Sequence, residues 1–245
     1  FTRDIEMTLD IRRVIAFYDN TASMDSYLPA LSPAMQQASV IVQLCGGTEC
    51  TVGACWYNDY GEVGANVCGA LSCTSDLDRM SAFLKKFSSP YGGGGFPEAF
   101  KTGLVHHVLP MCDEHTLVLH FTDAYPHMDE NLLDRQGKLE RQALRDPNNR
   151  SMVFTDPLSG YTYSQRRSEL SEHADFSEDW EWSALVNRFR QTGARMVTMH
   201  TDARETSKPS KVFADLGEMT TVQRKTADIL QNTVDRILGT MGVDI

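Results

Sequence analysis

The sequence predicts an α/β protein with a doubly wound, mostly parallel central sheet, one antiparallel edge strand and helices on both faces. Short apolar runs typical of buried parallel strands alternate along the chain with amphipathic helical segments. Two of these runs end abruptly at an aspartate, Asp19 and Asp123, and ligands of such sheets bind outside the carboxyl ends of the strands. A length of 245 residues, with 41% hydrophobic and 23% charged residues, suits one domain over residues 1–245.

The first half of the chain predicts three strands and two helices. Residues 14–18 form an apolar strand that stops at Asp19. Residues 50–57 and 63–71 predict two strands that pair antiparallel at one edge, because the residues between them favour a tight turn. Residues 76–87 predict an amphipathic helix. The segment after the first strand predicts a long helix that ends at two glycines, with these apolar positions: Leu28, Leu31, Met35, Val40 and Leu44.

The second half predicts a helix over residues 97–108 that begins at Pro97, and a fourth strand over residues 116–122. His106 and His107 are adjacent on that helix, so we expect one to face the core and the other to face solvent. A fifth strand is expected over residues 194–200. Three further helices are expected over residues 179–192, 211–216 and 226–241.

Residues 126–178 do not follow this alternation. At about 50 residues the segment is too long for an ordinary connection, so we interpret it as an insertion that contains a hairpin around residues 156–160. It follows Asp123 directly, and we therefore expect it to lie beside a site at that strand end and to form part of a partner surface.

Composition narrows the possible partners. A net charge of −10 argues against nucleic acid or an anionic membrane as the main partner, and no apolar run is long enough to span a membrane. The six cysteines include no Cys-x-x-Cys pair, so a zinc ribbon is not expected. Free, mostly buried thiols are favoured over the alternative disulfides, which are Cys45–Cys50 and Cys68–Cys73.

The first strand is followed by Asp19, Thr21 and Ser23, which are spaced two apart. One carboxylate and two hydroxyls are hard oxygen ligands that suit Mg²⁺, Mn²⁺ or Ca²⁺ and do not suit Zn²⁺. Asp123 holds the same position at the end of the fourth strand, so these four side chains are expected to converge on one cation. The alternative is that Asp19 or Ser23 simply caps the next helix.

A glycine-rich loop, Gly92–Gly95, lies between these two strand ends in the sequence. Glycines let a backbone turn sharply or approach a ligand closely. The loop lacks the Gly-Lys-Ser/Thr ending of a nucleotide-binding P-loop, so it does not predict a nucleotide site. The alternative is a plain flexible loop.

Together these motifs resemble those of the von Willebrand factor type A family over residues 11–125 and 179–241. The metal-ion-dependent adhesion site of that family combines Asp-x-Ser/Thr-x-Ser, a glycine-rich loop and Thr-Asp after the fourth strand, which are similar to residues 19–23, 91–99 and 121–124. The form of the last two motifs is most similar to the intracellular, kinase-associated branch. The resemblance implies a doubly wound, Rossmann-like fold and a divalent cation whose open position takes an acidic group of a protein partner.

One position departs from the family pattern. Gly95 stands where the family supplies a threonine or an aspartate, and glycine has no side chain to coordinate a metal. The favoured expectation is that water fills the gap and metal binding is weak; the alternative is that Glu98 reaches the cation directly or through water.

The favoured interpretation is a binding module, not an enzyme. One alternative is a metal-free structural scaffold. The other is a Mg²⁺-dependent phosphohydrolase of the haloacid dehalogenase type, although Thr21 stands where such an enzyme needs a second carboxylate.

Overall fold

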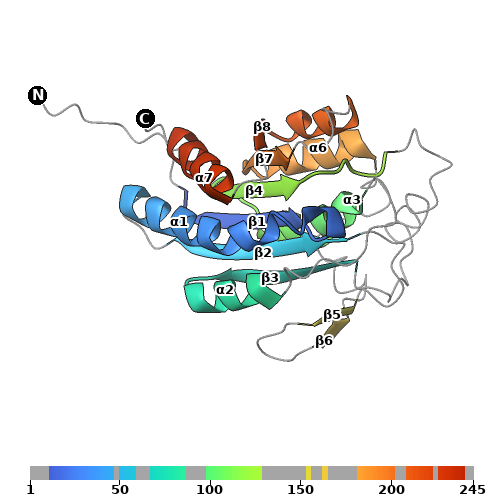
Figure 1. The fold of residues 1–245 in the computed structure, drawn as a ribbon. Helices are drawn as coiled ribbons and strands as arrows, with labels where there is room; N and C mark the ends of the chain where they lie inside the picture. The colour runs from blue at the N-terminus through green and yellow to red at the C-terminus, as the bar shows by residue number, and fades with distance from the viewer. Residues whose placement is uncertain are drawn as a thin grey trace, which may run out of the picture.

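The computed structural model describes residues 11–46, 50–58, 67–86, 98–128, 153–155, 162–164, 181–201, 208–222 and 226–240. Its centre is a six-stranded sheet with the strand order β3-β2-β1-β4-β7-β8 (Figure 1). Neighbouring strands are parallel except for β2 and β3, which confirms the predicted doubly wound α/β fold with one antiparallel edge strand. The strands are β1 (Arg13–Asp19), β2 (Thr51–Tyr57), β3 (Cys68–Thr74), β4 (Thr116–Thr122), β7 (Arg195–Thr201) and β8 (Glu218–Val222).

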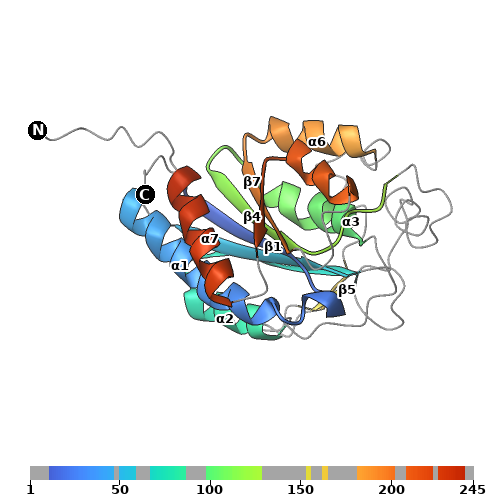
Figure 2. The same cartoon turned by 45° about the horizontal axis from the view of Figure 1, so that its top comes forward.

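Helices cover both faces of the sheet (Figures 1 and 2). One face carries α1 (Leu28–Gly46), α2 (Leu77–Lys86) and α7 (Thr226–Thr240), and the other carries α3 (Phe100–Gly103) and α6 (Trp182–Gln191). Short helical turns occupy Ala22–Met24, Leu104–Val108, Leu109–Met111 and Lys208–Asp215.

The middle strands are buried on both sides because each contributes alternate residues to two apolar cores. In β1, Val14 and Ala16 pack toward α1, whereas Ile15 and Phe17 pack toward α3 and α6. This explains why β1 and β4 are continuous apolar runs in the sequence, as expected for parallel strands covered by helices on both faces.

The two edge strands differ from the prediction. β3 lies at Cys68–Thr74, where the predicted strand covered residues 63–71, of which 63–66 lie outside the described residues. Trp56 of β2 packs against Gly69, where a Cβ would stand only 2.7 Å from the indole, so the small residues of β3 are what allows this pairing. β8 was not predicted, because Glu218–Val222 has no apolar run and is held by its parallel pairing with β7.

The helix predicted over residues 97–108 is irregular. It is α-helical only over Phe100–Gly103, continues as a π-helical turn over Leu104–Val108 and ends in a 3-10 turn that contains Pro110. The expectation that one of its histidines faces solvent is wrong, because His106 and His107 are both buried. Burial lowers the pKa of His107 to about 3, so its imidazole is neutral near pH 7.

The long predicted helix is present as α1, which accommodates Pro33 within it. Three of its five predicted apolar positions are buried, namely Leu28, Leu31 and Met35. The other two, Val40 and Leu44, are exposed, so the apolar surface of α1 extends beyond the core.

Within the insertion, β5 (Val153–Thr155) pairs antiparallel with β6 (Thr162–Ser164), which confirms the predicted hairpin. β5 contacts β3, and Figure 1 shows the hairpin near the end of the sheet at which β1 and β4 finish. Residues 129–152 and 165–178 lie outside the described residues, as does most of the predicted turn at 58–61.

Five cysteines are free thiols, namely Cys50, Cys55, Cys68, Cys73 and Cys112, whereas the side chain of Cys45 lies outside the described ones. Within the described residues, no helix has both the length and the apolar character needed to cross a membrane.

Candidate functional site

The candidate site lies where β1 and β4 end side by side. The two strands are parallel neighbours in a register that pairs Tyr18 with Phe121. Asp19 closes β1, while Thr122 closes β4 and Asp123 follows it. Because the carboxyl ends of parallel strands meet at one edge of the sheet, the topology alone brings Asp19 and Asp123 together.

Asp19 is held by three hydrogen bonds. Its Oδ1 accepts one from the backbone N–H of Thr21 at 2.9 Å and one from the Thr21 hydroxyl at 2.6 Å. Its Oδ2 accepts a third from the Thr122 hydroxyl at 3.2 Å, a donor that it shares with the Ala124 carbonyl oxygen, also at 3.2 Å. The carboxylate is therefore fixed in one orientation, and Asp19 has no exposed surface.

Two further contacts extend this arrangement to the second strand end. The Ser23 hydroxyl donates to Asp123 Oδ1 at 2.9 Å, and the hydroxyls of Thr21 and Ser23 lie 3.2 Å apart. Each hydroxyl donates its one proton to an aspartate, so the 3.2 Å contact brings together two hydrogen-bonded pairs, Asp19–Thr21 and Ser23–Asp123. The structure brings the four expected side chains together, while their role as metal ligands remains a prediction.

The capping alternative has one local contact in this geometry, the Thr21 backbone N–H that donates to Asp19 Oδ1 at 2.9 Å. The turn Ala22–Met24 has Thr21 at its N-cap, with no side-chain hydrogen bond to the cap. The Ser23 hydroxyl is used for Asp123 instead.

The electrostatics of the site favour a cation. Burial, and secondly the negative charge of Asp123, raise the pKa of Asp19 to about 7, against the lowering effect of its hydrogen bonds. A divalent cation between the two carboxylates would relieve both effects. The described part of the chain contains no group of three or more His, Cys, Asp or Glu side chains that could hold a metal. The site offers two carboxylates and two hydroxyls, a set that suits a cation such as Mg²⁺ that retains several waters.

Glu98 and Gly95 were the predicted loop contribution. Glu98 is buried, its backbone N–H donates to the Tyr125 carbonyl at 3.0 Å, and its carbonyl accepts from the His127 N–H at 3.3 Å. Its backbone is therefore paired with the segment that directly follows Asp123. Gly95 lies outside the described residues.

Sequence reasoning missed two residues at the site. Thr122 was seen only as part of a motif, yet its hydroxyl holds Asp19. Asn20 is 1% exposed, and neither atom of its side-chain amide has a hydrogen-bond partner among the described residues. The signal for both was their position beside the two strand-end aspartates.

A buried polar network beneath the site was also missed. The Tyr57 hydroxyl and His120 Nε2 lie 2.9 Å apart, and His120 Nδ1 lies 3.2 Å from the Thr198 hydroxyl. Burial, and then the proximity of His200, hold the pKa of His120 well below its usual range, so the ring is a neutral part of the core.

No family model matches the chain. Over 131 residues, which are 54% of its length, it is 28% identical to a protein of Acanthamoeba polyphaga mimivirus described as an ariadne-like RING finger protein. The match spans 12% of that relative.

Among solved structures, the pilus adhesin SpaC from Lactobacillus rhamnosus GG in its open conformation has a TM-score of 0.53 at 11% identity, over 95% of this chain and 30% of the adhesin. A von Willebrand factor type A structure from Catenulispora acidiphila has a TM-score of 0.48 at 12% identity, over 96% of this chain and 44% of the other. The chain thus spans less than a third of the adhesin, with which it shares a fold.

Proposed function

We propose that this chain is a protein-interaction domain whose site holds Mg²⁺ or Mn²⁺ through Asp19, Thr21, Ser23 and Asp123. The observation that carries the proposal is the close grouping of these four side chains at the carboxyl ends of β1 and β4. Thr21 donates to Asp19, Ser23 donates to Asp123, and the two hydroxyls lie 3.2 Å apart. The function is recognition, and no bond is broken.

Each residue has a role in this proposal. Asp19 and Asp123 contribute two negative charges, and Thr21 and Ser23 contribute neutral oxygens. Thr122 and the Thr21 N–H orient the Asp19 carboxylate. When bound, the cation supplies an open coordination position for a carboxylate of the protein partner. Mg²⁺ is favoured over Ca²⁺, which takes 6–8 oxygen ligands, because Mg²⁺ readily keeps waters where Gly95 offers no side chain.

We also propose where the domain belongs within the family that its motifs resemble. The forms of its glycine-rich and Thr-Asp motifs favour a position near the kinase-associated branch of the von Willebrand factor type A family. The relative described as a RING finger protein is much longer than the matched region. We therefore propose that such a domain serves as a recruiting module within a longer protein.

The direct test is a calorimetric titration of the protein with MgCl₂ and MnCl₂, repeated on Asp123→Asn. We expect weak binding that the variant loses. A panel of short acidic peptides is then screened with Mg²⁺ and with chelator, and any peptide that binds only with Mg²⁺ supports the open coordination position. Absence of any metal binding to the native protein contradicts the proposal.

One alternative has specific support. Because the site side chains already satisfy one another by hydrogen bonds, a metal-free scaffold is also consistent with the geometry. It predicts that the melting temperature responds to neither Mg²⁺ nor chelator. The phosphohydrolase alternative predicts Mg²⁺-dependent hydrolysis of a generic phosphomonoester, which we do not expect because Thr21 cannot act as a general acid.

A further inference from the structure

Three sulfur-bearing side chains gather at the amino end of β1 and β4, at the opposite edge of the sheet from the candidate site. We call Cys73, Met111 and Cys112 the sulfur cluster. The Cys73 thiol donates to the Met111 thioether, with Sγ and Sδ 4.0 Å apart, and Cys112 follows Met111 directly. All three side chains are half-buried and pack against the core that α3 and α6 cover. They are therefore ordered by packing and still within reach of a solute.

The sulfur cluster lies beside a fixed positive charge. Arg13 Nη1 donates to the Met111 carbonyl at 2.6 Å and to Asp113 Oδ2 at 2.9 Å, so the guanidinium is held against the segment that carries Met111 and Cys112. Its charge acts on the thiols of both Cys73 and Cys112, and the two thiols also act on each other. The two cysteines are thus close together, at one end of the sheet and near one cation.

We propose that the sulfur cluster is a Cu(I) site, in which the thiolates of Cys73 and Cys112 and the thioether of Met111 bind the metal. Soft thiolate and thioether ligands select Cu(I) among the metals that proteins bind. Metal–sulfur bonds are about 2.3 Å long, and three such bonds in one plane hold the sulfur atoms about 4.0 Å apart. This is the separation of Cys73 Sγ and Met111 Sδ, so the metal takes the place of the thiol proton that lies between them.

The same ligand set does not suit the other common metals. Zn²⁺ takes four ligands from cysteine, histidine and carboxylate side chains. The described part of the chain has no group of three or more such side chains that could hold a metal. Mg²⁺ and Ca²⁺ take oxygen ligands, which the carboxyl end of β1 and β4 offers and the sulfur cluster does not. The two ends of the sheet therefore favour metals of opposite character.

Charge also favours a monovalent metal at this place. Burial raises the pKa of Cys73 to about 11 and that of Cys112 to about 12, against the lowering effect of Arg13, so both thiols are protonated near pH 7. Cu(I) releases one proton from each thiol when it binds. The bound cluster then carries one net negative charge, which Arg13 faces with its positive charge.

The neighbouring strand leaves room for the Cys73 side chain. Gly53 of β2 lies next to it, and a Cβ at that position would stand 2.9 Å from Cys73 Sγ. Any larger residue would push the thiol out of its present place. Glycine thus allows the thiol to lie where it meets Met111.

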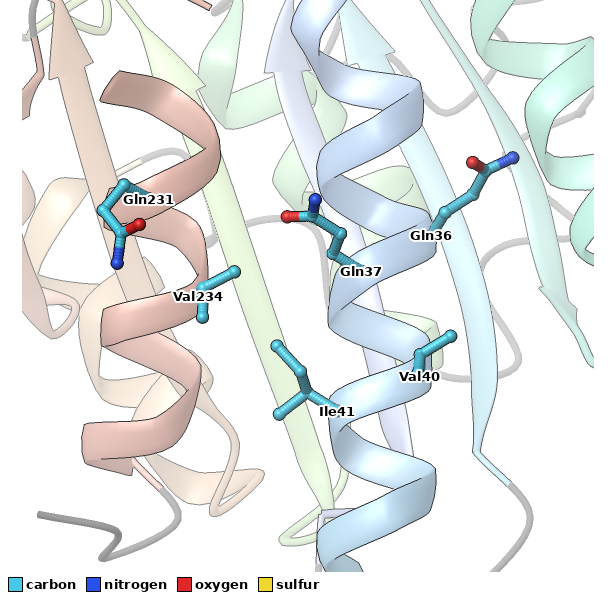
Figure 3. A pocket seen from close by; sticks show the side chains of 6 residues that line it. All are labelled: Gln36, Gln37, Val40, Ile41, Gln231 and Val234. Atoms are coloured by element: carbon cyan, nitrogen blue, oxygen red, sulfur yellow. The ribbon is translucent and has the colours of Figure 1, made fainter. Parts of the chain in front are cut away.

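The open groove between α1 and α7 offers no comparable chemistry (Figure 3). In the figure, Gln37 and Ile41 point toward α7, and Val234 points back toward Ile41. Its lining consists of aliphatic and amide side chains: Gln36, Gln37, Val40, Ile41, Gln231 and Val234. These provide neither thiolate nor carboxylate, so the groove does not compete with the sulfur cluster for a metal.

The test is an anaerobic titration of the reduced chain with Cu(I) supplied as its bicinchoninate complex, whose absorbance falls as the protein takes the metal. The native protein is expected to take one equivalent. Cys73→Ser and Cys112→Ser are each expected to weaken binding more than about 100-fold, because each removes a charged soft ligand. Met111→Leu, which nearly conserves volume, is expected to weaken it about tenfold.

Cys50→Ala is the matched control. Cys50 is also a free thiol at this end of the sheet, but it is buried in the core on the opposite face. Its replacement is expected to leave Cu(I) affinity unchanged. X-ray absorption of the Cu(I)-loaded proteins supplies a second measurement, with three sulfur ligands expected in the native protein and two in Met111→Leu.

Three results would overturn the proposal. One is a native protein that takes no Cu(I) from bicinchoninate. Another is a loss of affinity in Cys50→Ala as large as that in Cys73→Ser, since that would mean adventitious binding to any free thiol. The third is a native protein with only two sulfur ligands on the metal. Met111→Leu keeps both thiols, so it remains informative if the serine variants do not fold.

Discussion

β1 and β4 lie side by side, and each end of this strand pair carries an aspartate and a threonine. The charges around the aspartate differ between the amino ends and the carboxyl ends of the two strands. At the amino end, Arg13 Nη1 donates to Asp113 Oδ2 at 2.9 Å, and the Thr116 hydroxyl donates to Asp113 Oδ1 at 2.7 Å. At the carboxyl end, a threonine hydroxyl also holds an aspartate, but the charged group that acts on Asp19 is a second carboxylate, Asp123.

The pKa values show what the difference means. Partial burial raises the pKa of Asp113, but hydrogen bonds from Thr116 and the charge of Arg13 lower it more, so the net shift is downward. Burial and Asp123 shift the pKa of Asp19 upward, to about 7. The amino end is a structural ion pair, whereas a proton on Asp19 relieves the unfavourable burial of charge at the carboxyl end, and under our proposal a cation would do the same. Such unbalanced sites are candidates for function.

The largest expected effect comes from exchanging each aspartate for its neutral isostere. Asp19→Asn is expected to weaken Mg²⁺ binding by more than about 100-fold, since it removes a ligand charge. Without metal near pH 8, it is expected to be at least as stable as the native protein, because a buried carboxylate is removed. Asp113→Asn is the matched control. It is expected to keep Mg²⁺ binding and to lose about 1 kcal/mol of stability. Calorimetry and thermal melts would check both, and equal metal affinity in the two variants would contradict the comparison.

The second prediction concerns pH. The pKa of Asp19 rises from 3.8 to about 7 on folding, so the metal-free folded state binds more protons than the unfolded state between these values. The stability that proton binding to Asp19 contributes is fully present below pH 3.8 and is lost as the pH rises through 7. Between about pH 5.5 and 7, native protein is expected to lose about 2 kcal/mol relative to Asp19→Asn.

Asp113 is expected to behave in the opposite way, because its pKa is lower in the folded state than in the unfolded state. Its ionised form stabilises the fold at pH values above the unfolded pKa, and this stabilisation is lost on acidification. Denaturant unfolding of the three proteins from about pH 8 to about pH 3 measures both trends, because the Asp113 contribution changes only below its unfolded value of 3.8. Mg²⁺ should raise the melting temperature near pH 8 and have little effect near pH 5, because protons compete for Asp19. A pH-independent difference between native protein and Asp19→Asn would contradict the account of the carboxyl end.

A smaller effect is expected from restoring the missing loop ligand. Gly95→Asp adds a third carboxylate where the von Willebrand factor type A motif, which the sequence resembles, has a side chain, and we expect it to tighten Mg²⁺ binding about tenfold. Gly95→Ala is the matched control, because it changes the backbone freedom equally and adds no ligand. If calorimetry finds the two variants alike, the loop does not reach the cation, and Glu98 or water completes the site.

The sequence predicted the carboxyl end well, because buried apolar strands and polar strand ends are local signals. Asp19 and Asp123 end their strands where the apolar runs stop, and the parallel topology then brings them together. Features set by distant contacts were missed. β8 has no apolar pattern and exists because Gly217 lets its backbone approach Met196 closely, as a Cβ there would stand 2.1 Å from the Met196 carbonyl oxygen.

Helix periodicity had a related limit. α1 has apolar residues on more than one side, so its sequence could not show that Leu31 faces the sheet while Val40 and Leu44 remain exposed. His120 likewise lies within an apolar strand, and its hydrogen bonds to Tyr57 and Thr198 depend on residues far away in the sequence.

The smallest expected effect comes from removing a single threonine hydroxyl at either end of β4. Thr122 and Thr116 stand at opposite ends of β4, both are fully buried, and each donates to an aspartate. Replacement by valine keeps the shape and removes the hydroxyl. Thr116→Val is expected to cost about 1 kcal/mol of stability and to leave Mg²⁺ affinity unchanged. Thr122→Val is expected to cost a similar amount and also to weaken Mg²⁺ binding about threefold, because Asp19 Oδ2 loses the donor that orients it. Thr122→Ser, which restores a hydroxyl, should recover the affinity. If both valine variants lose stability and neither changes Mg²⁺ affinity, the Thr122 hydroxyl does not orient Asp19 for metal binding. The two ends of the strand would then differ only in charge.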